Sequence, residues 1–251
     1  MSEHVRLEID DDVAWITLDR PDKHNALSYD DWTDLSRAAT AAGADERAQV
    51  VVLRGAGERA FCSGADLGEL AERDAYAAYE NAIRLQSVGN QFAQLRKPTI
   101  AMLNGLALAG GLELALCCTF RVASDRAKVG LPEVRMATLA GAGGTQRILR
   151  FAPPGVALRM LLLGDLIAAE DALRLGIVDD VVPAERLLDD VTALARRLCE
   201  NDPRTTALIL DAVRVASEGG LASGLAGEAA LFGMTTSYDA FRDRIAEFKK
   251  K

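Results

Sequence analysis

The chain has 251 residues, of which 49% are hydrophobic and 26% are charged, and its formal net charge is −8 at pH 7. This is the composition of an ordinary globular protein, and the length allows one large domain or a domain with an appendage. The acidic balance argues against nucleic-acid binding, which needs clustered lysine and arginine side chains.

The histidines and cysteines exclude further classes of site. His4 and His24 are the only histidines, and they lack the spacing of a multi-histidine zinc centre. The four cysteines form no Cys-x-x-Cys motif and no paired framework, so we expect reduced thiols, as in the cytoplasm. The N-terminus lacks the pattern of a signal peptide, and the longest apolar stretch, residues 105–118, is too short to span a bilayer. We therefore expect a cytoplasmic protein without a metal and without membrane association.

The first elements follow from simple periodicity. Residues 5–9 alternate between apolar and polar, and with the turn at residues 10–12 and the run at 13–18 they predict a β-hairpin. Ser28 is expected to cap a helix. The buried side of that helix is predicted to consist of Trp32, Leu35, Ala39 and Ala42.

Strands and helices then alternate along the chain. The β-branched run at residues 50–53 predicts a buried strand, a glycine-containing loop follows over 55–66, and helices are expected over 67–95. A helix is expected from Gly110 to about residue 118. Further strands are expected over 99–103, 120–123, 127–129 and 177–182. Alternation of this kind indicates a layered α/β domain.

The pattern changes after Pro183 and is helical to the end of the chain, with helices expected over 184–199, 204–216 and from 221 onward. We therefore divide the chain into an α/β core, residues 1–183, and a C-terminal helical module, residues 184–251. The module is small for an independent domain, so we expect it to pack on the core or on a neighbouring subunit.

Two glycine-containing segments, residues 61–67 and 104–113, each run into a predicted helix. A helix start presents unpaired N–H groups and the positive end of a dipole, so two such starts together can hold an oxyanion. The alternative is that the glycines only permit tight turns and close packing. A phosphate-binding loop is a weaker interpretation, because Gly111 and Leu112 stand where lysine and a hydroxyl residue are needed.

Two glutamates lie close to these segments in the sequence. Glu113 falls in the first turn of an otherwise apolar helix, and Glu133 follows a predicted strand. Read singly, Glu113 could simply complement the helix N-terminus, and Glu133 could be an exposed turn residue. Together, two carboxylates can perform general acid–base chemistry on one water and share one proton in a poorly solvated pocket.

At this point the chain resembles the enoyl-CoA hydratase/isomerase family, the crotonase family, nearly from end to end. The motifs that carry the resemblance lie at residues 20–27, 60–67, 104–115 and 131–147. The resemblance implies an α/β fold of the ClpP/crotonase type, with a spiral ββα core and a C-terminal helical module. It also implies an acyl-CoA substrate, no cofactor beyond the coenzyme A of that substrate, and a homo-oligomer, either a trimer or a dimer of trimers.

The resemblance also assigns residues. It implies that the N–H groups of Ala65 and Gly110 form an oxyanion hole and that Glu113 and Glu133 are the catalytic acid–base pair. The residues that correspond to the coenzyme A thioester site are Lys23, Asn25, Ala26, Leu27, Ala65, Asp66, Leu67, Gly68 and Gly110. The function that follows is an enoyl-CoA hydratase of fatty acid β-oxidation type. Alternatives are a sister reaction on acyl-CoA (isomerisation, decarboxylation or thioester hydrolysis) and a non-catalytic CoA-binding homologue.

The chain departs from the family pattern at several positions. Ala109 replaces a glycine that is common in the family's glycine-rich run, and Ala137 and Ala140 stand where the family often has glycine and proline. Gly68 stands where many relatives place a lysine, which leaves Lys23 as the candidate cation for the CoA phosphates.

Overall fold

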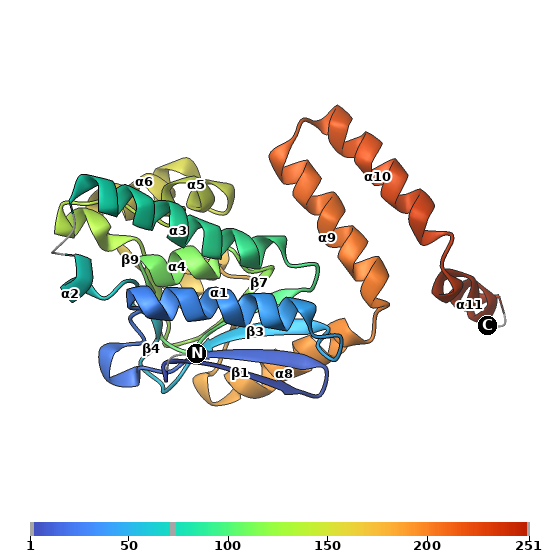
Figure 1. Ribbon diagram of the computed structural model, residues 1–251, viewed down its shortest axis with the longest axis horizontal. Coiled ribbons are helices and arrows are strands. Elements are labelled where there is room, and N and C mark those ends of the chain that lie inside the picture. The colour runs from blue at the N-terminus through green and yellow to red at the C-terminus, as the bar shows by residue number, and fades with distance from the viewer. Residues whose placement is uncertain (1–2, 71–73, 250–251) are drawn as a thin grey trace.

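Two β-sheets carry the fold (Figure 1). The computed structural model describes residues 3–70 and 74–249. The larger sheet has the strand order β1-β2-β3-β5-β7-β10, in which β1 and β2 are antiparallel and the later pairs are parallel. Its strands are β1 (Val5–Asp10), β2 (Val13–Leu18), β3 (Val50–Gly55), β5 (Thr99–Leu103), β7 (Phe120–Ser124) and β10 (Asp180–Val182).

The predicted hairpin is confirmed, with Val5 opposite Leu18 and Asp10 opposite Val13. Asp11 and Asp12 form its turn with φ values of 51° and 66°. Positive φ at both central residues suits the right-handed twist of the flanking strands, and aspartate tolerates this conformation better than most residues.

The larger sheet is buried on both faces. One face packs against α1 (Tyr29–Ala44), whose predicted apolar side is confirmed as buried and whose N-terminus is closed by a capping box between Ser28 and Asp31. The other face packs against α8 (Leu187–Cys199), which directly follows the predicted domain boundary. Alternate residues of β2 and β3 enter the two cores, as the period of a strand requires.

The smaller sheet has the order β4-β6-β8-β9, with strands β4 (Ala60–Cys62), β6 (Leu106–Leu108), β8 (Lys128–Gly130) and β9 (Leu166–Ala168). The prediction of a continuous loop over residues 55–66 is therefore wrong, because β4 lies inside it. The strand β6 was not predicted either. Both strands lie in glycine-containing segments that show no clear strand pattern, whereas the equally short β8 was predicted over 127–129.

The chain passes repeatedly from the larger sheet to the smaller one. β3 leads to β4, β5 leads to β6 and β7 leads to β8, and a helical segment follows each time. Those segments are α2 (Leu67–Leu70) with α3 (Ala75–Gln94), then α4 (Gly110–Ala115), then the short 3₁₀ helix η2 (Pro132–Met136). This spiral of ββα units confirms the predicted fold class, although β10 begins at Asp180 rather than at Ile177.

Helices complete the chain. Between the spiral and β10 lie α5 (Gly144–Arg147), α6 (Pro154–Leu163) and α7 (Ala169–Arg174). After α8 come α9 (Pro203–Glu218), α10 (Leu221–Thr235) and α11 (Asp239–Phe248), so the single helix predicted from residue 221 onward is two helices.

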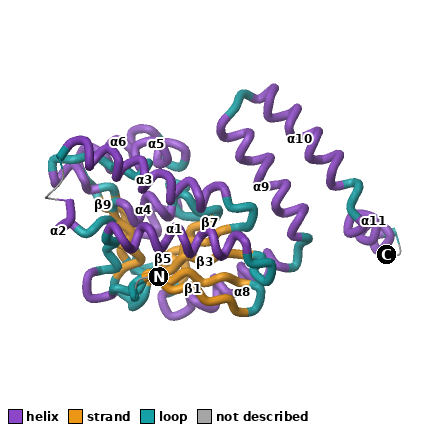
Figure 2. Tube along the Cα trace, in the orientation of Figure 1, coloured by secondary structure: helices purple, strands orange, loops and turns teal. Residues whose placement is uncertain are grey.

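The last three helices project from the body of the molecule. α9 and α10 lie side by side as a helical hairpin, and α11 lies at its far end (Figures 1 and 2). Neither α10 nor α11 buries a residue, and Leu221, Phe232 and Phe248 are 80%, 66% and 79% exposed. Among the described residues, no helix has the length and apolar character needed to cross a membrane.

Candidate active site

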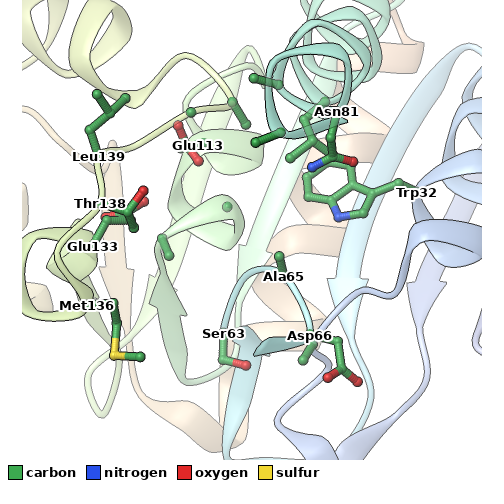
Figure 3. Close-up of a pocket in the computed structure, with 18 of the residues that line it drawn as sticks. Trp32, Ser63, Ala65, Asp66, Asn81, Glu113, Glu133, Met136, Thr138 and Leu139 are labelled. Carbon is green, nitrogen blue, oxygen red and sulfur yellow. The ribbon is translucent and has the colours of Figure 1, made fainter. Parts of the chain in front are cut away.

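The site lies where the parallel strands of the smaller sheet end. β4, β6 and β8 are neighbours, so their carboxyl ends meet at one edge. The residues that follow these strands, among them Ala65, Gly110 and Glu133, line one cavity of about 850 Å³ (Figure 3). Ligand sites at the carboxyl ends of parallel strands are a general property of α/β folds.

Two loops at this edge approach each other closely. Gly64 has a φ of 103°, and a Cβ atom there would lie 2.9 Å from the Cβ of Ala109. A Cβ atom on Gly111 would lie only 2.1 Å from the carbonyl oxygen of Cys62. These glycines are therefore required for the approach of the two backbones, as the packing interpretation of the sequence proposed.

The same approach places two N–H groups together. A Cβ atom built on Gly110 would lie 3.8 Å from the amide nitrogen of Ala65. Within the described part of the chain, neither of these N–H groups donates to a backbone carbonyl. Both residues line the cavity, so the arrangement leaves two neighbouring N–H donors beside it without a backbone acceptor.

Ala109 immediately precedes the second donor and is held in an unfavourable conformation. Its φ and ψ are 49° and −127°, a region that favours glycine, and its own N–H donates to the carbonyl of Gly130 at 3.0 Å. A residue forced into such a region costs about 1–3 kcal/mol, so the surrounding structure must impose it. Ala137, a second departure from the family pattern, also has a positive φ, of 54°.

Glu113 is a buried carboxyl group on α4, with only 3% of the residue exposed. Its Oε1 accepts a hydrogen bond of 2.6 Å from the N–H of Gly144, at the start of α5. Burial raises the pKa of Glu113 to about 7; the Gly144 hydrogen bond opposes that rise, and the nearby Glu133 carboxylate adds to it. At neutral pH the group therefore exists in both protonation states.

Glu133 lies at the start of η2 and is half-buried. Both of its carboxyl oxygens are sealed from bulk water, and neither has a hydrogen-bond partner among the described residues. Burial raises the pKa of this carboxyl group as well. Glu113 and Glu133 line the same cavity (Figure 3), and two such carboxyl groups share a proton more readily than both ionise.

The predicted thioester-site residues divide into two groups. Lys23, Ala26, Ala65, Asp66 and Gly110 line the cavity. Asn25, Leu27 and Gly68 are not among its lining residues. Leu67 opens α2, and its side chain lies outside what the structure describes.

Asn25 and Leu27 instead hold the loop that carries Ala65. The buried Asn25 amide donates to the carbonyl of Ala60 at 2.8 Å. The Leu27 N–H donates to the carbonyl of Gly64 at 2.8 Å, and the Leu27 carbonyl accepts from the next N–H after Ala65 at 2.9 Å. Their structural role is to hold the loop that carries the Ala65 N–H group.

Asp66 is fixed by two contacts of its own. Its Oδ2 accepts from the Arg20 guanidinium at 2.9 Å, and its Oδ1 accepts from the N–H of Gly68 at 3.0 Å. The Gly68 hydrogen bond, together with Arg20, lowers the pKa of this carboxyl group. Lys23 is the one cation among the described residues that line the cavity.

The remaining wall was not assigned from the sequence. It consists of Trp32, Ser63, Ala78, Asn81, Ala82, Leu85, Ala109, Pro132, Met136, Thr138, Leu139, Gly141 and Ala142. Trp32 is buried as predicted, but it is also a wall of the cavity. Helical periodicity shows which side of α1 faces inward and cannot show that a cavity lies there.

Comparison with known proteins shows the family to which the chain belongs. A family profile described as Enoyl-CoA hydratase/isomerase matches residues 8–251. A crotonyl-CoA hydratase from Syntrophomonas wolfei is 33% identical over 249 residues, which is 99% of this chain and 96% of the relative. The 2,3-dehydroadipyl-CoA hydratase of Escherichia coli is 37% identical over 239 residues, 95% of this chain and 92% of the relative. The crystal structure of an enoyl-CoA hydratase from Bacillus anthracis superposes with a TM-score of 0.94 at 32% identity, covering 99% of this chain and 96% of that one.

The raised pKa of Glu113 predicts a pH-dependent stability. The folded protein holds this proton up to a pH of about 7, whereas the ordinary pKa is 4.5, so folding is favoured at low pH. The stabilisation of the folded state by this proton is complete below pH 4.5 and is lost as the pH rises through 7. Relative to Glu113→Gln, the wild-type free energy of unfolding should therefore fall by about 3 kcal/mol across this range.

Urea denaturation at fixed protein concentration, repeated between pH 4.5 and 8, measures this difference. A wild-type stability that runs parallel to that of Glu113→Gln over the whole range would contradict the raised pKa.

Proposed function

Because the chain belongs to the enoyl-CoA hydratase/isomerase family, we propose that it is an enoyl-CoA hydratase. It adds water across the 2,3 double bond of a 2-enoyl-CoA thioester and produces a 3-hydroxyacyl-CoA. The observation that carries the proposal is the convergence of two carboxyl groups, Glu113 and Glu133, beside the paired N–H groups of Ala65 and Gly110.

The two N–H groups act on the thioester oxygen in this proposal. As the water oxygen bonds to the β-carbon, the electrons of the double bond move toward the thioester and form an enolate. The N–H groups of Ala65 and Gly110 stabilise that negative charge. Because the charge is largest in the transition state and the donors are fixed in advance, the interaction favours the transition state over the substrate.

The carboxyl pair handles the protons. One carboxylate of the pair accepts a proton from the attacking water, and a carboxyl group of the pair delivers a proton to the α-carbon. The pair thus keeps the same number of protons. One hydrogen atom of the water stays in the product hydroxyl group, and the other replaces on the pair the proton that was given to the α-carbon. A pKa near 7 for Glu113 suits this exchange, since proton transfer is most efficient when the pKa lies near the working pH.

The Gly144 N–H has a separate role. It occupies one lone pair of Glu113 Oε1 and so fixes the orientation of the carboxyl group toward the cavity. The chemistry needs no redox cofactor, and coenzyme A enters as part of the substrate. We place the enzyme in the cytoplasm, in the degradation of acyl-CoA thioesters by β-oxidation.

Replacing either carboxyl group by an amide tests the acid–base pair. Glu113→Gln and Glu133→Gln should each lower kcat for crotonyl-CoA hydration by at least about 10²-fold, because general acid–base assistance typically contributes 10²–10⁴-fold. Affinity for a saturated acyl-CoA, measured by isothermal titration calorimetry, should change little. The exposed Glu185 provides the matched control, Glu185→Gln. Rapid hydration by either active-site variant would rule out the pair.

Removing one N–H donor tests the oxyanion hole. Gly110→Pro deletes the donor, whereas Gly110→Ala keeps it and adds a methyl group that would lie 3.3 Å from Trp32. The loss of one donor typically lowers the rate by about 10²–10³-fold, so the proline variant should be slower than the alanine variant by that factor. Circular dichroism establishes that both variants fold. Equal turnover by the two folded variants would show that Gly110 only permits packing.

We further propose a homo-oligomer, a trimer or a dimer of trimers. Its support is the apolar surface of α10 and α11, where Leu221, Phe232 and Phe248 are exposed in the single chain. Surfaces of this kind on a soluble protein usually mark an interface. Multi-angle light scattering at micromolar concentration should give three or six times the mass of 26.8 kDa. A monomeric mass would contradict the proposal.

A further inference from the structure

The segment that hydrogen-bonds the buried active-site carboxyl group, residues 141–147, is bound at both ends by side chains of α3. Gln86 Nε2 donates to the carbonyl of Gly141 at 2.9 Å, and Asn90 Oδ1 accepts a hydrogen bond from the guanidinium of Arg147. Positions four apart lie on the same face of a helix, so both contacts come from one side of α3. The helices α3 and α5 accordingly lie next to each other (Figure 1).

The Arg147 side chain packs against the turn at the start of α5. A Cβ atom on Gly143 would lie 3.2 Å from its Nε and 3.7 Å from its Cδ. Gly143 is the N-cap of α5 and has a φ of 111°, and its carbonyl accepts from the backbone N–H of Arg147 at 2.9 Å. The N–H of the same peptide group, that of Gly144, donates to Glu113 Oε1 at 2.6 Å. One peptide group therefore connects Arg147 to the carboxyl group.

Arg147 also brings a positive charge to this place. Among the described residues, its side chain forms no ion pair, and its hydrogen-bond partner is the uncharged amide of Asn90. A carboxylate partner would largely cancel the field of the guanidinium, whereas an amide holds the group and leaves its charge in effect. The side chain is half-buried, so water screens the charge only in part.

Two charged groups act on Glu113. Burial raises the pKa of Glu113 to about 7; the Glu133 carboxylate of η2 adds to that rise, and Arg147 of α5 opposes it, in addition to the backbone hydrogen bond described above. Cys117 on α4 and Cys62 on β4 are neutral thiols, because burial raises their pKa values to about 11 and about 12. The α3 side chains that bind the segment are uncharged amides. Arg147 is thus the positive charge that acts against Glu133.

We propose that Arg147, held by Asn90, is a positioning residue of the site, which packs against the turn that binds Glu113 and supplies the positive charge that offsets Glu133. Arg147 is not among the described residues that line the active-site cavity and borders a neighbouring cavity of about 700 Å³, so it acts through Glu113 rather than on the substrate. The inference rests on the proposed hydratase function, in which Glu113 takes part in proton transfer. Without this charge, the carboxyl pair would hold its protons to a higher pH.

Removing the charge tests the proposal. Arg147→Met keeps an apolar stem against Gly143 and removes the guanidinium. The midpoints of the profile of kcat/KM against pH should then move to higher pH, because the protonated forms of the carboxyl pair are favoured. The expected rise is roughly 0.5–1 pH unit, less than the 1–3 pH units that a directly paired charge produces, since Arg147 makes no direct contact with Glu113.

Three further variants isolate the effect of the charge. Arg147→Lys keeps a positive charge and should have midpoints close to those of the wild type. Arg150, three residues further along, is exposed and provides the matched control Arg150→Met, which should leave the midpoints unchanged. Asn90→Asp places a carboxylate against Arg147 and should raise the midpoints as Arg147→Met does. It gives an independent measurement if Arg147→Met fails to fold by circular dichroism.

Three outcomes would overturn the proposal and leave the hydratase assignment standing. Wild-type midpoints in folded Arg147→Met would show that its charge does not reach the carboxyl pair. An equal rise in Arg147→Met and Arg147→Lys would assign the effect to packing rather than to charge. An equal rise in Arg150→Met would assign it to the net charge of the protein.

A measurement without substrate separates this inference from the proposed function. In protein labelled with ¹³C at the glutamate side-chain carboxyl groups, the NMR signal of Glu113 is identified by its absence in Glu113→Gln. Its titration midpoint should be higher in Arg147→Met than in the wild type and in Arg150→Met. If the wild-type protein hydrates no enoyl-CoA thioester, the proposed function fails, and this titration still tests Arg147 alone. An unchanged midpoint in Arg147→Met would refute the inference.

Discussion

The close approach of two backbone segments, residues 62–65 and 109–111, is the constraint on which the site depends. No side chain fits between the carbonyl of Cys62 and the α-carbon of Gly111, and Gly64 leaves room only for the methyl group of Ala109. The two segments are extensions of the adjacent strands β4 and β6, so the pairing of those strands fixes the distance between the N–H groups of Ala65 and Gly110. These two N–H groups are therefore held by the sheet, as the preorganised oxyanion hole of the proposed function requires.

The strain at Ala109 belongs to the same constraint. The residue is the N-cap of α4 and links that helix to β6. A glycine would adopt its φ of 49° at little cost. The presence of alanine shows that hydrogen bonding to Gly130 and the packing of α4 are strong enough to impose the conformation.

Much of the fold was predictable from the sequence, for physical reasons that differ from element to element. β2 and β3 are six-residue strands whose apolar runs show directly that they are buried, and Ser28 marks the start of α1 by its capping chemistry. β4 and β6 were not predicted, because each lies in a glycine-containing segment without a clear strand pattern and their pairing is a property of the assembled sheet.

The residues of the candidate site likewise include some that the sequence identified and some that it did not. Ala65, Gly110, Glu113 and Glu133 could be named because each stands in a motif, and the structure places all four around one cavity. Trp32 and Asn81 could not, since a tryptophan in a helical apolar stripe is indistinguishable from an ordinary core residue. Only the meeting of α1 and α3 over the end of the smaller sheet makes the two residues part of a wall.

The two halves of α3 differ in burial. Its buried residues, Val88, Gly89 and Phe92, all lie toward its C-terminal end, where a Cβ atom on Gly89 would lie 2.9 Å from the sulfur of Cys117. The part that lines the cavity, from Ala78 to Leu85, contains no fully buried residue. Local unfolding free energies follow burial, so amide hydrogen exchange should be slow near Phe92 and fast near Ala78. In evolutionary terms, substitutions along this weakly held stretch can remodel substrate preference at small thermodynamic expense, while the chemistry stays anchored in the sheet behind it.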